Sequence, residues 1–307
     1  MVGAGAVGTA IAYAAQIRGV CRQLALFDLN AEKVRAEVLD LNHGLQFTPM
    51  ARITGSDELA VCADADVVVI TAGAKQRPGQ TRLDLAAANV AMCRELVPAL
   101  VELAPDALVL VVTNPVDVVT YAALQFSGLP SQRVFGSGTV LDSSRLRFLI
   151  AEHTGVAVQN VHAYIAGEHG DSEVPLWSTA TIGGVPVRDW GAAGERPLDE
   201  TARALIHNRV VTSAYEIIAG KGATSLAIGL AVSRILEAAL NDEHRVLPVT
   251  SRLDGVHGLS DVCLSMPAVV GRAGVERVLA TPLSDGEREQ LVASAQTVRA
   301  AARDLGL

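Results

Sequence analysis

The sequence is poor in aromatic residues and in cysteine. Aromatic side chains make up 4% of the 307 residues, so a core must consist mainly of Ala, Val, Leu and Ile. The four cysteines, Cys21, Cys62, Cys93 and Cys263, lie far apart and form no CxxC pair. This spacing argues against a disulfide framework and against a zinc or other metal site, and it favours a reducing cytoplasm.

Long apolar runs and excess positive charge are also missing. No run reaches the roughly 18 residues that a membrane-spanning helix requires, and no basic segment followed by an apolar one marks a signal peptide. The 25 Lys and Arg residues are outnumbered by 33 Asp and Glu residues, which gives a net charge of −8. This balance argues against nonspecific binding to nucleic acid, although a small anion could still bind in a local basic pocket.

The first half of the chain alternates between two kinds of segment. Short apolar runs rich in β-branched residues occur at 24–28, 67–73, 107–114 and 133–136. Segments with helical periodicity lie between them, at 7–19, 31–42, 83–103 and 116–126. Buried strands that alternate with helices predict βαβ units and a parallel sheet covered by helices on both faces.

The second half has a different pattern. A helix is expected at 141–153, a strand at 159–166, long helices at 195–219 and 223–241, a β-rich run at 245–253, further short strands, and a last helix from about 284. This mixture is typical of an α+β domain. With 50% hydrophobic residues, the chain is long enough for two domains, and we place the boundary near residue 140.

The first residues carry a glycine pattern that binds dinucleotides. Residues 3–8 read GAGAVG, so Gly3, Gly5 and Gly8 match G-x-G-x-x-G before a helical segment. Asp28 follows Gly8 by 20 residues and ends an apolar run. An acidic residue there accepts hydrogen bonds from a ribose 2′-hydroxyl and repels a 2′-phosphate, which favours NAD over NADP. Only two residues precede Gly3, so either the start is truncated or the first strand is shorter than usual.

Together these patterns predict the fold. We expect an α/β protein with a Rossmann-type, doubly wound parallel sheet at residues 1–140 and an α+β domain at 141–307.

Four further motifs share one family resemblance. They are GAKQRPGQTRLDL (73–85), TNPVD (113–117), GSGTVLDSSRLR (136–147) and YIAGEHGDSEVP (164–175). In this order and spacing, they resemble the lactate/malate dehydrogenase family over essentially the whole chain. GSG before LDSSR is closer to the lactate dehydrogenase branch. The resemblance implies an NAD-dependent homotetramer that interconverts a 2-oxo acid and an L-2-hydroxy acid.

The chemistry of that reaction matches particular residues. Reduction of a 2-oxo acid needs a proton donor, a cation that polarises the carbonyl and an anchor for the carboxylate. His169 suits the proton donor, because imidazole changes charge near neutral pH, and Asp142 suits its orienting partner. Arg145 suits the anchor, and Arg82 would polarise the carbonyl when loop 74–81 closes.

Each of these residues also has an ordinary interpretation. His169 could be a loop histidine, Asp142 a helix N-cap, Arg145 a surface charge, and Asn114 before Pro115 a turn residue. Their joint occurrence in one order favours the catalytic interpretation. A protein that only senses NAD would use the glycine motif and Asp28 without needing the others.

The resemblance also implies further binding residues. Asn114 would contact the substrate oxygen or position the cofactor and His169, and Thr224 would line the substrate pocket. The expected cofactor contacts are Gly3, Gly5, Val7, Gly8, Asp28, Thr71, Ala72, Gly73, Thr113, Asn114 and Ser137.

The loop before Arg82 is expected to select the substrate. In the family, the discriminating position lies six residues before the polarising arginine, which here is Gln76. A neutral amide leaves the second carboxylate of oxaloacetate unpaired and accepts the methyl group of pyruvate. Pyruvate and L-lactate are therefore the expected substrates. A shift of the loop that turns Arg77 inward would instead favour malate dehydrogenase activity.

Arg147 and His162 predict a second site. Arg147 follows Arg145 by two residues, or about 200° around a helix, so the two side chains point in nearly opposite directions. His162 precedes His169 by an odd number of residues, which in an extended segment places it on the other face. In bacterial allosteric members of the family, an arginine and a histidine at these positions bind fructose 1,6-bisphosphate between subunits. The alternative is an ordinary contact between subunits.

Overall fold

A parallel sheet forms the amino-terminal half of the molecule. The computed structural model describes residues 1–74, 82–192, 194 and 196–307, without the side chains of Arg82 and Leu83. The parallel strands are β1 (Gln23–Phe27), β2 (Arg52–Ser56), β3 (Val67–Ile70), β4 (Leu108–Val111) and β5 (Val134–Gly136). Val2 bridges Phe27 and Ile70 in parallel register. The order is therefore β2-β1-Val2-β3-β4-β5, and one bridging residue occupies the position of the first strand.

Helices cover both faces of this sheet, as the alternation of segments predicts. They are α1 (Ala6–Arg18), α2 (Ala31–His43), α3 (Arg82–Leu103) and α4 (Val116–Ser127). Alternate residues of β4 separate the two cores. Leu108 and Leu110 lie in a cluster with residues of α1 and α2, whereas Val109 and Val111 lie in a cluster with residues of α3 and α4. The doubly wound α/β fold is thus confirmed.

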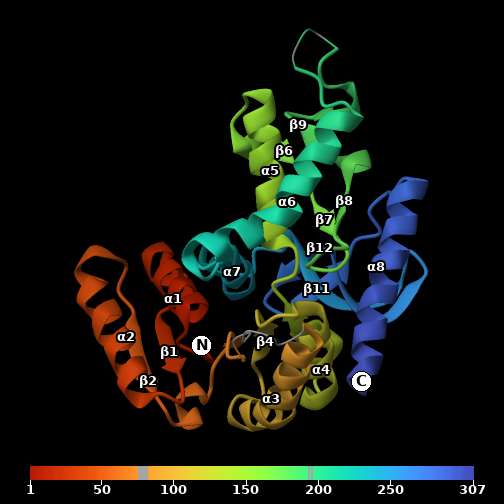
Figure 1. Ribbon diagram of the computed structural model, residues 1–307. Coiled ribbons are helices and arrows are strands. Elements are labelled where there is room, and N and C mark those ends of the chain that lie inside the picture. The colour runs from red at the N-terminus through yellow and green to blue at the C-terminus, as the bar shows by residue number, and fades with distance from the viewer. Residues whose placement is uncertain (75–81, 193, 195) are drawn as a thin grey trace.

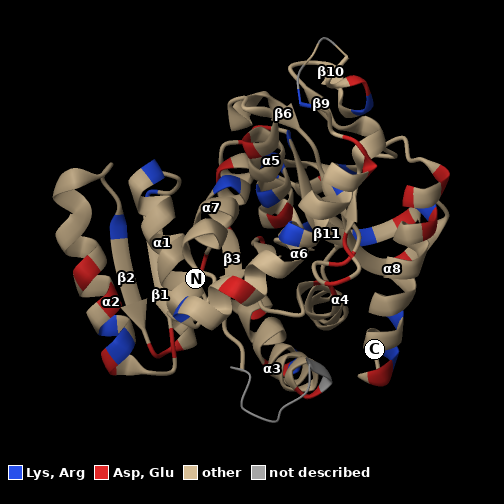
Figure 2. Cartoon of the chain, turned by 45° about the horizontal axis from the view of Figure 1, so that its top comes forward, with Lys and Arg blue, Asp and Glu red and all other residues tan. Residues whose placement is uncertain are grey.

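The carboxyl-terminal half extends the same sheet. The strands β11 (Arg245–Val256), β12 (Leu259–Gly271) and β13 (Gly274–Val278) are antiparallel to one another. β11 pairs with β5 through Thr250 and Gly136, so a sheet of order β13-β12-β11-β5-β4-β3 crosses both halves. Strands β3 and β4 contain no charged residue, whereas charged residues occur all along α8 (Asp285–Asp304) (Figure 2).

Most of the remaining elements lie above this sheet in Figure 1, and α7 (Leu226–Leu240) lies beside α1. The remaining elements are the helices α5 (Val140–Thr154), α6 (Glu200–Lys221) and α7, with the short strands β6 (Val161–His162), β7 (Ile165–Ala166), β8 (Val174–Pro175), β9 (Thr181–Ile182) and β10 (Val185–Pro186). Helix α7 returns to pack against α1. Among the described residues, no helix is both long and apolar enough to cross a membrane.

Several expected boundaries were wrong. The strand expected at 159–166 is two short strands in different sheets, since β6 pairs with β9 and β7 pairs with β8. The helix expected from 195 begins at Glu200, because Asp199 caps it by accepting a hydrogen bond from the Ala202 N–H. The helix expected from 223 begins at Leu226. Strand β2 was not expected, because its sequence RITGS buries one side chain, Ile53, and forms no apolar run.

Candidate active site

The glycine loop leaves room for a pyrophosphate in front of α1. Gly3 has a φ of +105°, and a Cβ atom there would lie 2.6 Å from the Ala72 nitrogen. A Cβ on Gly8 would lie 2.0 Å from the Gly3 carbonyl oxygen, whereas a Cβ on Gly5 would meet no atom within 4 Å. Gly3 and Gly8 therefore pack the loop, and Gly5 faces open space at the first turn of the helix, as a bound dinucleotide requires.

Asp28 lies directly beside this loop. Its Oδ2 accepts a hydrogen bond from the Ala4 N–H at 2.8 Å, and its Oδ1 accepts one from the Asn30 N–H at 3.1 Å. The carboxylate is partly exposed. It is thus held at the end of β1 in the position that suits hydrogen bonding to a ribose.

The end of β3 is hydrogen-bonded to the glycine loop, and the ends of β3, β4 and β5 are hydrogen-bonded to one another. The Thr71 hydroxyl donates to the Gly3 carbonyl at 2.9 Å, and the Thr113 hydroxyl donates to the Ala72 carbonyl at 2.6 Å. The Ser137 N–H donates to the Val111 carbonyl at 2.8 Å. These residues therefore meet at the edge of the sheet where ligands of such folds bind.

Two more expected cofactor contacts lie in this region. A Cβ on Gly73 would lie 2.7 Å from the Thr113 Cγ2 atom, so the β3 and β4 ends approach closely. Val7 lies in the first turn of α1 and is partly buried against the core cluster that contains Leu108 and Leu110. The loop, Asp28 and the strand ends together fit NAD.

The predicted catalytic residues His169 and Arg145 meet at the buried carboxylate of Asp142. His169 Nδ1 lies 2.6 Å from Asp142 Oδ2, and Arg145 Nη1 donates to Asp142 Oδ1 at 2.8 Å. The Asp142 side chain is 2% exposed, whereas those of His169 and Arg145 are 25% and 14% exposed. Asp142 and Arg145 share one face of α5, and His169 comes from the loop between β7 and β8. The carboxylate thus orients both cations, which remain accessible.

Charge in this cluster favours a protonated imidazole. Burial lowers the pKa of His169, but the carboxylate of Asp142 more than compensates and raises it to about 9. Burial raises the pKa of Asp142, but His169 and Arg145 outweigh this effect and hold it below its usual value. At neutral pH, His169 is therefore protonated.

Asp117 and Thr250 form a hydrogen-bonded chain that ends at the backbone of His169, and the sequence did not indicate this role. Asp117 Oδ2 accepts a hydrogen bond from the His169 N–H at 2.8 Å, and its Oδ1 accepts one from the Thr250 hydroxyl at 2.5 Å. Burial raises the pKa of Asp117 to about 6. The TNPVD motif contains Asp117, but Thr250 arrives from β11, so only the fold brings them together.

The family models match both halves of the chain. Residues 1–136 match the NAD binding domain of the lactate/malate dehydrogenases, and residues 139–305 match their alpha/beta C-terminal domain. The chain belongs to the lactate/malate dehydrogenase family. As a member of this family with the site described above, it is an NAD-dependent oxidoreductase.

Relatives within the family cover nearly the whole chain. An L-lactate dehydrogenase of Bifidobacterium animalis subsp. lactis is 56% identical over 307 residues, which are 100% of this chain and 96% of that protein. L-lactate dehydrogenase B of Hordeum vulgare is 47% identical and covers 100% of this chain and 90% of its own. The ligand-bound crystal structure of the minor L-lactate dehydrogenase of Enterococcus mundtii has a TM-score of 0.95 at 40% identity and covers 99% of this chain and 96% of its own.

Asn89 is a third residue of the site that sequence reasoning missed. It is 2% exposed. Its Oδ1 accepts a hydrogen bond from the Ala74 N–H at 2.8 Å, and its Nδ2 donates to the Asn114 carbonyl at 2.7 Å. It therefore ties the residue before segment 75–81 to the Asn114 turn. An amide in the apolar stretch AAANVAM was the available signal.

The other predicted substrate residues are placed as follows. Asn114 is exposed at the end of β4, and its Oδ1 accepts a hydrogen bond from the Val116 N–H at 3.3 Å. Thr224 is partly buried in the turn between α6 and α7. Gln76 and Arg77 lie outside the described residues. Arg82 begins α3, but its side chain also lies outside the described part of the structure.

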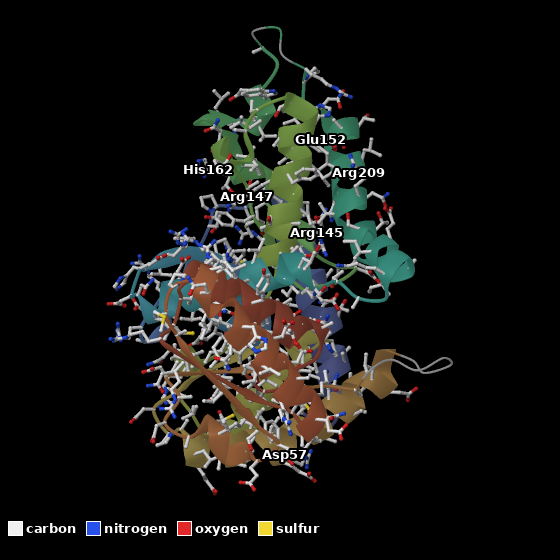
Figure 3. All side chains as sticks on the ribbon, turned by 90° about the vertical axis from the view of Figure 1, so that its left-hand side faces the viewer. Asp57, Arg145, Arg147, Glu152, His162 and Arg209 are labelled. Atoms are coloured by element: carbon white, nitrogen blue, oxygen red, sulfur yellow. The ribbon has the colours of Figure 1, made fainter. Side chains whose placement is uncertain are left out.

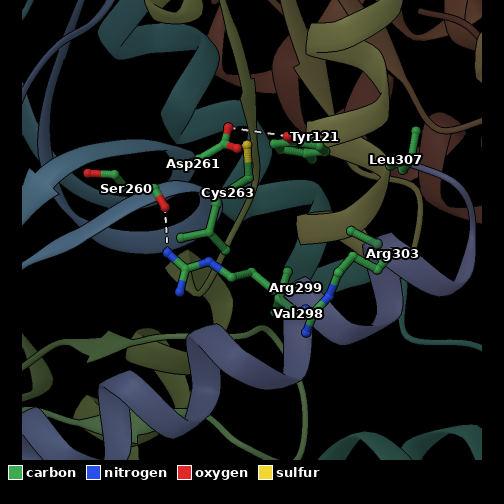
Figure 4. A pocket seen from close by; sticks show the side chains of 10 residues that line it. Tyr121, Ser260, Asp261, Cys263, Val298, Arg299, Arg303 and Leu307 are labelled. Carbon is green, nitrogen blue, oxygen red and sulfur yellow. Dashed lines mark hydrogen bonds between the residues drawn. The ribbon is translucent and has the colours of Figure 1, made fainter.

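Two other features lie away from these residues. A cavity of about 350 Å³ is lined by α4, β12 and α8, where Tyr121 donates to Asp261 at 3.2 Å and Arg299 donates to the Ser260 carbonyl (Figure 4). Among the described residues, the exposed side chains of Asp242, His244 and Glu276 form a cluster of possible metal ligands. Neither feature contains a residue of the catalytic cluster.

Proposed function

We propose that the protein is an L-lactate dehydrogenase that interconverts pyruvate and L-lactate. The observation that carries this proposal is the contact of His169 and Arg145 with the buried carboxylate of Asp142. The names of the relatives and the sequence at Gln76 support lactate rather than malate as the substrate. The alternatives are malate dehydrogenase activity and a noncatalytic sensor of NAD.

The side chains have separate tasks in this reaction. Bound NADH supplies the hydride that reaches the carbonyl carbon of pyruvate. His169 donates its proton to the carbonyl oxygen and takes it back when lactate is oxidised. Asp142 favours the charged imidazole and fixes the ring nitrogen that faces the substrate. Arg145 binds the carboxylate of the substrate through paired hydrogen bonds.

Arg82 and Gln76, whose side chains lie outside the described part of the structure, complete the proposal. Arg82 is the proposed cation that polarises the carbonyl. Gln76 is the proposed selector of pyruvate over oxaloacetate, because a neutral amide leaves a second carboxylate unpaired. Support for this part comes from the sequence alone.

A spectrophotometric assay tests the function. Purified protein is mixed with NADH and either pyruvate or oxaloacetate, with and without fructose 1,6-bisphosphate. We expect faster loss of NADH absorbance with pyruvate, by at least about tenfold in kcat/KM. A preference for oxaloacetate would establish malate dehydrogenase activity. Loss of absorbance with neither acid would favour the sensor.

We also propose activation by fructose 1,6-bisphosphate at Arg147 and His162. These residues lie on one side of α5, and Arg145 lies on the other (Figure 3). The Arg147 Nε donates to the Ala163 carbonyl at 2.8 Å, and its guanidinium lies 4.8 Å from the centre of the Tyr164 ring. His162 is exposed in β6. An arginine and a histidine from each of two subunits would suit a bisphosphate.

The proposed active form is a cytoplasmic homotetramer. Large apolar side chains are exposed on the adjoining helices α1 and α7, including Tyr13 and Ile17 on α1 and Leu226 and Leu230 on α7. Exposed apolar side chains on adjacent helices favour contact with another subunit. The mass in solution, measured by light scattering, tests this assembly.

A further inference from the structure

Two buried side-chain atoms outside the cluster of Asp142, Arg145 and His169 have no hydrogen-bond partner among the described residues. They are Oε1 of Glu173 and Nε2 of His207, which lie 4.0 Å apart. Glu173 is 5% exposed, and it belongs to no step of the reaction described above. Because buried polar atoms are nearly always paired, this pair requires an explanation.

Glu173 lies within electrostatic range of the whole catalytic cluster. It follows the GEHGD motif and precedes β8, whereas His207 projects from α6. The titratable and charged groups that face Glu173 are Asp142 and Arg145 from α5, His169 and Asp171 from the loop, and His207 from α6. The charge of Glu173 therefore changes the field at the substrate site.

The charges of the cluster favour a neutral Glu173. At neutral pH, with His169 protonated and Asp142 and Asp117 ionised, the charges of these three groups and Arg145 sum to zero. An ionised Glu173 would make the cluster negative and repel the substrate carboxylate. Burial, followed by the repulsion of Asp142, raises the pKa of Glu173 to about 9. Burial also lowers the pKa of His207, which leaves a neutral imidazole that can accept a hydrogen bond.

Building on the proposed lactate dehydrogenase function, we propose that Glu173 stays protonated by sharing its proton with His207, and that this neutral pair preserves the positive charge with which Arg145 binds the substrate carboxylate. Glu173 is thus a positioning residue, because it acts through Arg145 and does not touch the substrate. A shared proton would give both unpaired atoms a partner without a net charge entering the interior, once their separation of 4.0 Å shortens to hydrogen-bond length.

The pair also predicts how substrate affinity changes with pH. Affinity is full while Glu173 is protonated, and it falls as the pH rises through the pKa of Glu173. His169 loses its own proton in the same alkaline range. The alkaline fall of kcat/KM in the wild-type protein therefore reports the loss of two protons.

Infrared difference spectra of the unliganded full-length protein test the protonation directly. A protonated carboxylic acid has a C=O stretch well separated from the bands of carboxylates. We expect this band in the wild-type protein at neutral pH, its loss in Glu173→Gln, and its shift in His207→Phe, which removes the acceptor. No difference between the wild type and Glu173→Gln would overturn the proposal, and an unshifted band in His207→Phe would exclude His207 from the pair.

Glu152→Gln is the matched control. This substitution makes the same chemical change at an exposed residue of α5. Glu152 forms an ion pair with Arg209 of α6 at 3.0 Å (Figure 3). We expect this variant to keep the infrared band and the wild-type kinetics. Because the spectra need no turnover, inactivity towards pyruvate would overturn the proposed function and leave the proton-sharing pair testable.

Steady-state kinetics test the consequence for binding. At neutral pH, the KM of Glu173→Gln for pyruvate should stay within about twofold of the wild-type value, because glutamine resembles the neutral acid. At alkaline pH, kcat/KM of the wild type should fall more steeply than tenfold per pH unit, towards about 100-fold, whereas that of Glu173→Gln falls about tenfold. Equal slopes in the two proteins, each reporting one proton, would contradict the role of Glu173.

Discussion

At the residue scale, Asp142 is the centre of the site. Its two carboxylate oxygens contact different side chains, the proposed proton donor His169 and the proposed carboxylate anchor Arg145. The same residue therefore sets both the charge of His169 and the direction of Arg145. An N-cap role alone, the ordinary alternative, does not describe it, because α5 begins at Val140 and both of its oxygens contact side chains.

Asp142→Asn separates the charge of this residue from its shape. The pKa of His169 is raised by Asp142, so its proton is retained below about pH 9 and is lost as the pH rises. Without the carboxylate, the pKa falls, and the alkaline limb of pyruvate reduction should move to lower pH. We expect kcat/KM at neutral pH to decrease on the order of a hundredfold or more. A pH profile with an unchanged alkaline limb would show that Asp142 does not control His169.

At the scale of elements, the start of α1 is fixed by a close backbone contact at Gly8 that leaves no room for a side chain there. Gly8 presses the first turn of the helix against the Gly3 carbonyl, while Gly5 faces open space. The two glycines thus have different reasons for lacking a side chain. Gly8 lacks a side chain because the fold leaves no space for one, and Gly5 because the cofactor needs that space.

Alanine at these two positions distinguishes the two reasons. Gly8→Ala should lower both the Tm and the affinity for NADH, because its Cβ would lie 2.0 Å from the Gly3 oxygen. Gly5→Ala should leave the Tm within about 2 °C but weaken NADH binding by at least about tenfold, because the methyl group enters the space for the pyrophosphate. Thermal unfolding and NADH fluorescence titrations measure these effects. Full NADH affinity in Gly5→Ala would refute the placement of the cofactor.

Helix α5 divides two proposed functions between its faces. Arg145 lies with Asp142 and His169, whereas Arg147 lies against Tyr164 and near His162. A separation of two residues on a helix suffices for this division. A movement of α5 would therefore couple an effector to the residue that binds the substrate.

At the scale of the whole molecule, this coupling can be measured. Fructose 1,6-bisphosphate should lower the apparent KM of the wild-type protein for pyruvate by about fivefold or more, a usual size for allosteric coupling. The double variant Arg147→Gln/His162→Gln should lose this response and keep its basal turnover without effector. Initial rates at millimolar effector, with mass measured in parallel, are the readout. A response that survives in the double variant would place the effector elsewhere.

The whole molecule also shows how far the sequence alone could lead. Apolar runs in a regular order predicted the parallel sheet, because strands buried on both faces consist of continuous apolar residues. Strand β2 escaped this criterion, since it lies at the edge and buries only Ile53. Likewise, the helix start at Glu200 depends on a cap by Asp199.

The sequence by itself determined the fold class, NAD as the cofactor, and the pairing of Asp142 with His169. These follow from local order and from motifs in which the spacing of a few residues carries the chemistry. Only the tertiary structure brought Thr250 to Asp117, Asn89 to the Asn114 turn, and His207 to Glu173. These contacts join distant segments whose meeting depends on packing, and a buried polar residue in a sequence does not reveal its partner.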